Sequence, residues 1–124
     1  MSENNNIKYQ KQTITIANGA VAGIQTESEI TLDVQYPRCT GISIIEKSNT
    51  GATTYDIGFK PNPNEVIADY QDRSLWLIPT GVKRDDCFRS FDFAVKGDKA
   101  SLLISTDAIT TAVIKLQVIY RLEK

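Results

Sequence analysis

The feature that most constrains the fold of this chain is a regular alternation of residue types over its last stretch, Thr111–Lys124. Every second residue there is apolar: Ala112, Ile114, Leu116, Val118, Tyr120 and Leu122. The residues between them are mostly polar, with Val113 and Ile119 as exceptions. Because successive side chains of a strand point to opposite faces, this pattern predicts a long β-strand with one face in a core. We expect a terminal strand of this length to lie between two partners inside a sheet.

Other strand-like stretches precede it, and turn-forming residues such as Asn18-Gly19 and Gly97-Asp98 separate them. The expected strands are Gln12–Ala17, Thr26–Val34, Cys39–Lys47, Thr53–Lys60, Ser74–Ile78, Cys87–Lys96 and Ala100–Thr106, with Glu65–Tyr70 either a strand or one helical turn. About eight or nine short strands with frequent turns are typical of a β-sandwich or barrel. We therefore predict an all-β fold, a single antiparallel β-sandwich that is jelly-roll-like, with an extended N-terminal arm.

A chain of 124 residues is expected to form one domain. Its first stretch, Ser2–Lys11, is rich in Asn, Gln and Lys, with Ile7 and Tyr9 as the only large apolar residues. We therefore divide the chain into an N-terminal arm, residues 1–11, and a β-sandwich domain, residues 12–124. In the strand expected over Thr26–Val34, we place Ile30, Leu32 and Val34 on the inner face.

The charge balance excludes several classes of partner. The chain has 14 basic and 15 acidic residues, intermixed along its length, for a net charge of -1. Nucleic-acid affinity comes mainly from clustered Lys and Arg, so we expect no nucleic-acid partner. A polybasic membrane anchor is likewise not expected, and no apolar run approaches the ~20 residues that cross a bilayer. Met1–Asn6 lacks the basic and apolar regions of a signal peptide, so we expect a protein that is made and kept in a cytosol, or assembled there.

The residues that usually carry out chemistry are scarce. The chain has no histidine, which removes the commonest general base and metal ligand. Its two cysteines, Cys39 and Cys87, cannot form a thiolate zinc site by themselves. We expect no enzyme activity, no cofactor and no metal. Both cysteines are expected to be buried free thiols, with a disulfide between them as the alternative.

Two charged features have open interpretations. The pair Asp85-Asp86 lies beside two basic residues and is expected in a solvated loop, with an ion or partner contact as the alternative. Arg89 falls on the apolar side of its strand, together with Phe91 and Phe93. It would pair with a carboxylate in the core, mark a subunit contact, or show that the alternation breaks at a bulge.

Trp76 is expected in the core because Leu75, Leu77 and Ile78 flank it. The alternative is an exposed platform on which sugars would stack. That platform would combine Trp76 with Tyr36, Tyr55 and Tyr70.

Three segments together carry a family resemblance: Tyr36–Ile42 entering a strand, Phe88–Val95, and the terminal strand that ends in Tyr120-Arg121-Leu122. In these features the chain resembles the small all-β virion proteins of tailed bacteriophages, especially auxiliary capsid and head proteins of crAss-like phages that infect Bacteroidetes. The resemblance implies a jelly-roll-like homo-oligomer that binds capsid or other virion proteins and reinforces the shell. It implies a virion location, after assembly in the host cytoplasm, and carries over no catalytic residue.

Extended arms bind by adding a strand to an exposed sheet edge. We accordingly expect Ile7 and Tyr9 to fill pockets on a neighbouring subunit. Arg89 is a further candidate contact with a partner. Two other functions are alternatives: a carbohydrate-binding or adhesive β-sandwich module, and a structural protein of the tail or neck.

Overall fold

The computed structural model describes residues 6–25, 28–77 and 88–124. Apart from one short 3-10 helix, the regular elements of these residues are strands. They are β1 (Ile7–Ile16), β2 (Gly23–Ile24), β3 (Ser28–Thr31), β4 (Arg38–Ser48), β5 (Tyr55–Lys60), β6 (Ala68–Asp72), η1 (Arg73–Leu75), β7 (Arg89–Ala94), β8 (Lys99–Thr106) and β9 (Ile114–Glu123). The predicted all-β class is confirmed.

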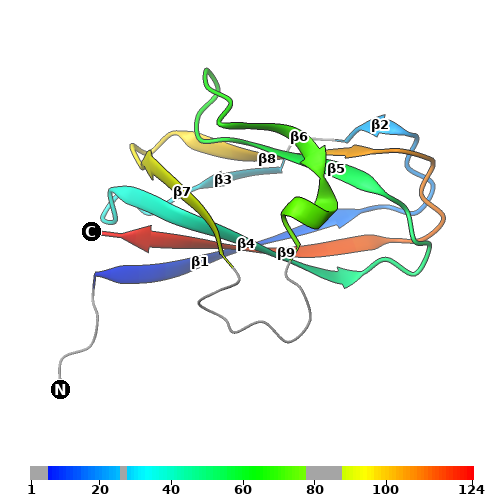
Figure 1. Cartoon of the computed structure of the whole chain (residues 1–124), viewed down its shortest axis with the longest axis horizontal. Helices are drawn as coiled ribbons and strands as arrows, with labels where there is room; N and C mark the ends of the chain where they lie inside the picture. The colour runs from blue at the N-terminus through cyan, green and yellow to red at the C-terminus, as the bar shows by residue number, and fades with distance from the viewer. Residues whose placement is uncertain (1–5, 26–27, 78–87) are drawn as a thin grey trace.

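The strands form two sheets that pack face to face (Figure 1). The first sheet has the order β1-β9-β4-β7, and the second has the order β2-β8-β5-β6, with β3 also paired to β8. Every pairing between these strands is antiparallel. The described part of the chain is therefore the antiparallel β-sandwich that the alternation predicted.

The strand pairs are nested along the sequence. β1 pairs with β9, β2 and β3 with β8, β4 with β7, and β5 with β6. The chain is thus one long hairpin whose tip is the β5–β6 turn, rolled up so that β9 also pairs with β4 and β8 with β5. This arrangement is a jelly roll, in which β2 and β3 share one strand position.

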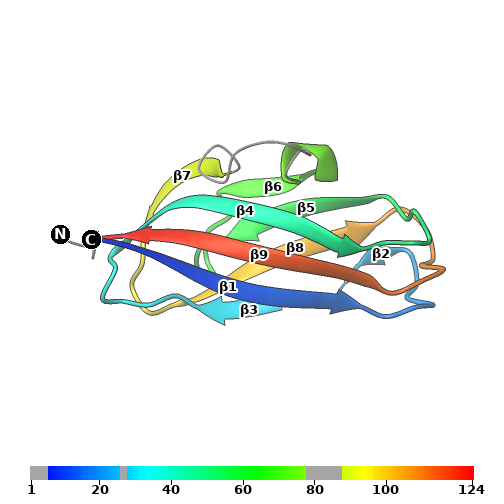
Figure 2. The ribbon, with the colours of Figure 1, turned by 90° about the horizontal axis from the view of Figure 1, so that it is seen from below.

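The core lies between the sheets and is filled by every second residue of the inner strands. In β9 the inner side chains have no exposed surface: Ile114, Leu116, Val118, Tyr120 and Leu122. Tyr55, Ile57 and Phe59 of β5, also fully buried, face them from the other sheet. The ring centroid of Phe59 lies 5.9 Å from that of Tyr120 and 5.4 Å from that of Phe93. β9 lies between β1 and β4, as predicted (Figure 2).

The predicted start of the sandwich was too late. From Ile7 onward the chain is strand β1, and each residue from Ile7 to Ile16 has a partner in β9, beginning with the pair Ile7–Glu123. Residues Ile7–Lys11 therefore belong to the sandwich and not to an arm. The polar side chains of this stretch led to the prediction of a solvent-exposed arm. An edge strand, however, tolerates polar side chains, because its outer face is in contact with solvent and its backbone hydrogen bonds hold it in the sheet.

Ser74–Ile78 was also predicted wrongly, as a buried strand. Its described residues begin with the short helix η1, whose first turn is capped by the Asp72 carboxylate accepting from the Ser74 N–H. Trp76 then turns into the core, where it is 2% exposed, while Leu75 is 59% exposed. Consecutive apolar residues cannot all face inward from an alternating strand, and the tight turn directs Trp76 inside and Leu75 outside.

The inner face expected for Thr26–Val34 is correct at Leu32, which is 3% exposed, and wrong at Val34, which is 56% exposed. β3 ends at Thr31. The chain then turns, with the Tyr36 N–H donating to the Asp33 carbonyl at 3.0 Å. The two-residue alternation is lost in this turn, so Val34 no longer shares a face with Leu32.

Gly41 lies where neighbouring side chains approach the backbone of β4 closely. A Cβ at this position would lie 3.0 Å from the Phe88 Cβ and 3.2 Å from the Arg121 Nη2. The Arg121 guanidinium also lies over the Phe88 ring, 5.0 Å from its centroid, and donates to the Thr40 hydroxyl at 3.0 Å. The three segments that carry the family resemblance thus meet on neighbouring strands of the first sheet.

Candidate functional site

The outer edge of β1 is a candidate binding feature of the fold. In the described residues, β1 has one strand neighbour, β9, and it lies at the end of its sheet (Figure 2). The Lys124 N–H donates to the Asn6 carbonyl at 2.9 Å, so Asn6 and Lys124 form a hydrogen-bonded pair. Because such pairs alternate in an antiparallel ladder, the backbone groups of Lys11, Thr13 and Thr15 point away from β9.

The first half of β1 is covered by the chain itself. The Gln10 carboxamide donates to the Thr31 carbonyl at 3.0 Å and accepts from the Asp33 N–H at 3.1 Å. Lys8 forms an ion pair with Asp33 at 2.8 Å. Within the described residues, no contact of this kind reaches across the Lys11–Thr15 stretch.

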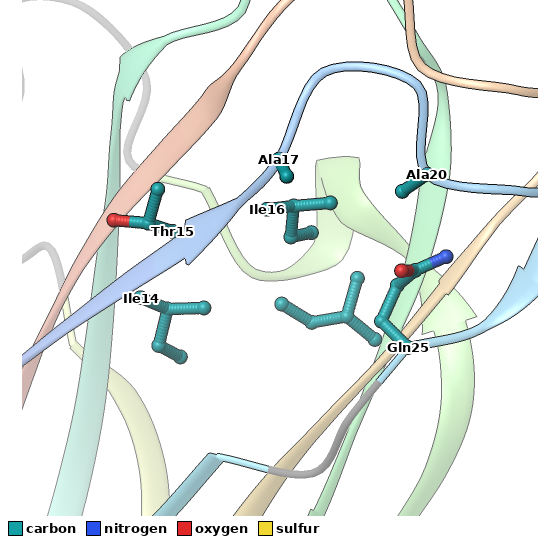
Figure 3. Close-up of a pocket in the computed structure, with 7 residues that line it drawn as sticks. Ile14, Thr15, Ile16, Ala17, Ala20 and Gln25 are labelled. Atoms are coloured by element: carbon teal, nitrogen blue, oxygen red, sulfur yellow. The ribbon is translucent and has the colours of Figure 1, made fainter.

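A pocket of about 390 Å³ opens beside the second half of β1 (Figure 3). It is lined by Ile14, Thr15, Ile16, Ala17, Ala20, Gln25 and Ile104. Ile14 and Ile16 point into it from the inner face of β1, whereas Thr15 points away. The pocket lies between the end of β1 in the first sheet and Gln25, which directly follows β2 in the second sheet. The Gln25 backbone N–H donates to the Ile104 carbonyl at 2.8 Å.

One polar group of this pocket, the amide nitrogen of Gln25, already has acceptors within the chain. The Gln25 Nε2 donates to the carbonyls of Val21 and Gly23 and to the Thr106 hydroxyl, at 2.9, 3.1 and 2.9 Å. The rest of the lining is mostly aliphatic, and the loop that supplies Ala20 and Gln25 also exposes Val21 and Ile24, at 75% and 72%. The side chains of Ile14 and Ile16 thus give the pocket an aliphatic wall, although polar atoms contribute as much of its surface as apolar atoms do.

Exposed lysines lie on the outer face next to this edge. Lys11 lies in β1, and Lys115 of β9 is paired with Thr15. Lys47 lies at a register irregularity of β4, between Glu46 and Ser48, and Ser48 pairs with Lys115. No described residue forms an ion pair with any of the three. The outward-facing positions around them carry no carboxylate: Thr13, Thr15, Ser43, Ile45, Gln117 and Ile119. This part of the face is basic, although the whole chain is not.

Arg89 does not pair with a carboxylate among the described residues. Its guanidinium stacks over Trp76, 4.4 Å from the ring centroid, and lies 5.4 Å from that of Phe91. Its Nη1 is buried and has no hydrogen-bond partner in the part of the chain that the structure describes, and burial lowers the pKa of the guanidinium. The pairing of β7 with β4 is irregular between Ser90 and Phe93, which agrees with the bulge interpretation. The role of Arg89 in binding a partner stays a prediction.

The sugar-stacking platform is not formed. Trp76 is 2% exposed and Tyr55 is fully buried, so neither ring offers a face to a ligand. Trp76 stacks instead on Phe91 with centroids 5.7 Å apart. The prediction that Trp76 belongs to the core is confirmed.

Ile7 and Tyr9 lie half-buried on the outer face of the first sheet. The Tyr9 ring packs on Phe88 of the same chain, with centroids 5.7 Å apart. They do not project on a separate arm, because both belong to β1. That they bind a neighbour remains a prediction.

A polar cluster joins the end of β4 to the helix η1. The Tyr55 hydroxyl donates to the Glu46 carboxylate, and the Arg73 Nη1 donates to the same oxygen at 3.2 Å. Burial, and then the hydrogen bond to Glu46, raise the pKa of the Tyr55 hydroxyl. Arg73 also donates to the Thr53 carbonyl at 3.1 Å. The donors and acceptors of this cluster satisfy one another, which indicates a structural role.

Cys39 is a buried free thiol, as predicted, and burial raises its pKa to about 12. Cys87 and the Asp85-Asp86 pair lie outside the described residues. Within the described ranges, no group of three or more Cys, Asp or Glu side chains is placed to hold a metal ion. The helical content of the same ranges includes no segment long and apolar enough to span a membrane.

Comparison with protein-family models, with curated proteins and with solved structures finds no match for this chain. The candidate site therefore rests on geometry alone. The sequence did not reveal the pocket or the lysines around it, since residues of β1, β4, β8 and β9 meet there only in the folded sheets. The alternation of β1 beyond Gln12 did place Ile14 and Ile16 on one face, where they are 4% and 5% exposed.

Proposed function

We propose that this chain is a structural protein of a bacteriophage virion, an auxiliary capsid or head component that binds capsid subunits and reinforces the shell. The observation that carries the proposal is the jelly-roll topology with an open strand edge at β1. Jelly rolls form viral capsid domains as well as lectins and cupins, so the fold supports the proposal by analogy. The resemblance of three sequence segments to phage virion proteins selects the capsid class among these.

The open edge supports a function that depends on contact. An unpaired strand edge is a template for another chain, and soluble proteins usually cover such edges or interrupt them. Among the residues that the structure describes, Gln10 and Lys8 cover the first half of β1, and no such contact covers the second half. In a shell, the remaining stretch would be buried against a neighbouring virion protein, and each copy of the chain would repeat that contact around the particle. The homo-oligomer that the family resemblance implies would use other surfaces of the chain.

The other candidate functions receive less support. A carbohydrate-binding module needs exposed aromatic rings, and Trp76 and Tyr55 are buried. A tail or neck protein would use the same fold and the same edge, so the position in the particle has to be measured.

The test is the composition and density map of purified phage particles from a culture that carries the gene. We expect peptides of this chain at a fixed ratio to the major capsid protein, and a jelly-roll density on the shell. A host ribosomal protein measured in the same sample serves as the contamination control. Absence of the chain from washed particles, at full abundance in the lysate, would refute the proposal; density confined to the tail or neck would refute its capsid assignment.

A further inference from the structure

We infer that the Lys11–Thr15 edge of β1 binds an extended segment of another protein, with aliphatic residues on one face and acidic residues on the other. The inference deepens the proposed function and rests on it in one respect, since it takes the partner to be another component of the same particle. Its evidence is the direction of the backbone groups, the pocket behind them and the charge beside them.

The backbone supplies the first element of recognition. Lys11, Thr13 and Thr15 each direct an N–H and a C=O away from β9, as the pairing of Asn6 with Lys124 fixes. An incoming strand can exchange hydrogen bonds with these residues over roughly 17 Å, at ~3.4 Å per residue. This contact does not depend on the sequence of the partner, so side chains have to supply the selectivity.

The pocket selects the inner face of the partner. Residues of an added strand that lie opposite Ile14 and Ile16 point to the same side as these two, which is the side of the pocket. The lining there is aliphatic except for Thr15, which points away, and Gln25, whose amide nitrogen already has three acceptors. An aliphatic side chain of the added strand would gain from burial against Ile14 and Ile16.

The lysines select the outer face of the partner. Outward residues of an added strand lie beside Lys11, with Lys115 one strand further and Lys47 beyond it. None of these ammonium groups is paired with a carboxylate of the described chain, so acidic side chains on the partner would complement them. Exposed pairs contribute only ~0.2–1 kcal/mol each, but they direct encounter and fix register.

A second copy of β1 fits this edge less well. The strand Ile7–Ile16 contains no acidic residue, and an added copy would bring its own Lys11 and Lys115 to the same face. Antiparallel pairing of two copies about Thr13 would also place Gln12 of one copy opposite Ile14 of the other. The charge and the pocket therefore both favour a different segment as the partner.

The experiment measures fluorescence anisotropy of a labelled synthetic ten-residue peptide, in which isoleucine or valine alternates with glutamate, titrated with the full chain. Two matched peptides replace either the glutamates with lysine or the aliphatic residues with serine. We expect saturable binding of the first peptide, and binding at least about tenfold weaker for each of the others. No saturable binding of the first peptide at millimolar protein, or equal binding of all three, would overturn the inference.

Variants locate the site. Thr13→Pro removes one outward N–H without breaking a bond to β9, and Ala17→Leu, at an exposed lining position, fills the pocket. Both should weaken binding about tenfold or more. The double variant Lys11→Glu and Lys115→Glu should reverse the preference toward the lysine peptide. Control variants are Ala108→Leu and Lys96→Glu, which change exposed residues outside the pocket and the basic face. Circular dichroism checks that each variant is folded.

The outcomes separate the two proposals. If Thr13→Pro fails to fold, the charge reversal decides, since it changes only exposed side chains. Folded variants that bind as tightly as the parent chain would overturn the inference even if the chain is found in particles. Conversely, selective binding to the β1 edge by a chain that is absent from particles would refute the virion proposal and leave the edge specificity standing.

Discussion

Replacing Leu116 with alanine tests the alternation on which the whole fold depends. Leu116 is fully buried in β9, with Ile14 and Glu46 as its cross-strand neighbours. Removing three carbons costs ~2.4 kcal/mol at ~0.8 kcal/mol per buried group. A central strand held on both sides cannot move far into the cavity, so a further cost is expected, within the ~2.7–5 kcal/mol range known for buried leucines. We expect a loss of about 3–4 kcal/mol.

The assay is equilibrium unfolding in urea, monitored by tryptophan fluorescence. The chain has one tryptophan, and Trp76 is 2% exposed, so its emission should shift to the red on unfolding. With a slope of ~2 kcal/mol per M, the midpoint should fall by roughly 1.5–2 M. A total stability of ~5–15 kcal/mol leaves the variant folded without denaturant.

The matched control is the neighbouring residue on the other face. Lys115 is exposed, so Lys115→Ala should change stability by no more than ~0.5 kcal/mol. Equal losses for both variants, or a loss below ~1 kcal/mol for Leu116→Ala, would show that the inner face of β9 is wrongly assigned.

Four further results are expected. Leu116→Asp should yield no native protein, because a carboxylate in the core costs several kcal/mol, and a soluble variant with a cooperative melt would contradict this. Gly41→Ala should lower stability by ~1–3 kcal/mol in urea unfolding, since its Cβ would meet the Phe88 Cβ at 3.0 Å, and an unchanged midpoint would show that this contact yields freely. Deleting residues 2–11 should lower the melting temperature sharply, because it removes half of β1. A melting curve equal to that of the parent chain would instead support the interpretation of these residues as a separate arm. In a Cys87→Ser background, Cys39 should resist thiol reagents at pH 8 and react on unfolding, and fast labelling of the native protein would refute its burial. Because burial raises the folded pKa of Cys39 to about 12, its contribution to stability is present below the unfolded pKa and is lost as the pH rises toward 12.

Where the residue pattern was periodic, the sequence predicted the structure well. The inner residues of β9 follow from a two-residue alternation, because burying one face of a strand fixes the side of every side chain in it. The predictions for Ser74–Ile78 and Val34 were wrong where a turn interrupts the strand, since a capping carboxylate or a backbone hydrogen bond there redirects the next side chain. Ile7–Lys11 was taken for an arm because its partner, β9, lies at the other end of the chain.

By itself, the sequence determined that this protein is built of strands and which face of most strands is buried. The tertiary structure decided the nesting of the strand pairs into a jelly roll, the position of β1 at an edge, and the meeting of Ile14, Gln25 and Ile104 around one pocket. These three features depend on contacts between residues that are far apart in the chain, and the local residue pattern does not indicate which distant residues form those contacts. The same holds for Lys11, Lys47 and Lys115, which are widely spaced in the chain and become one basic surface only through the register of β1, β9 and β4.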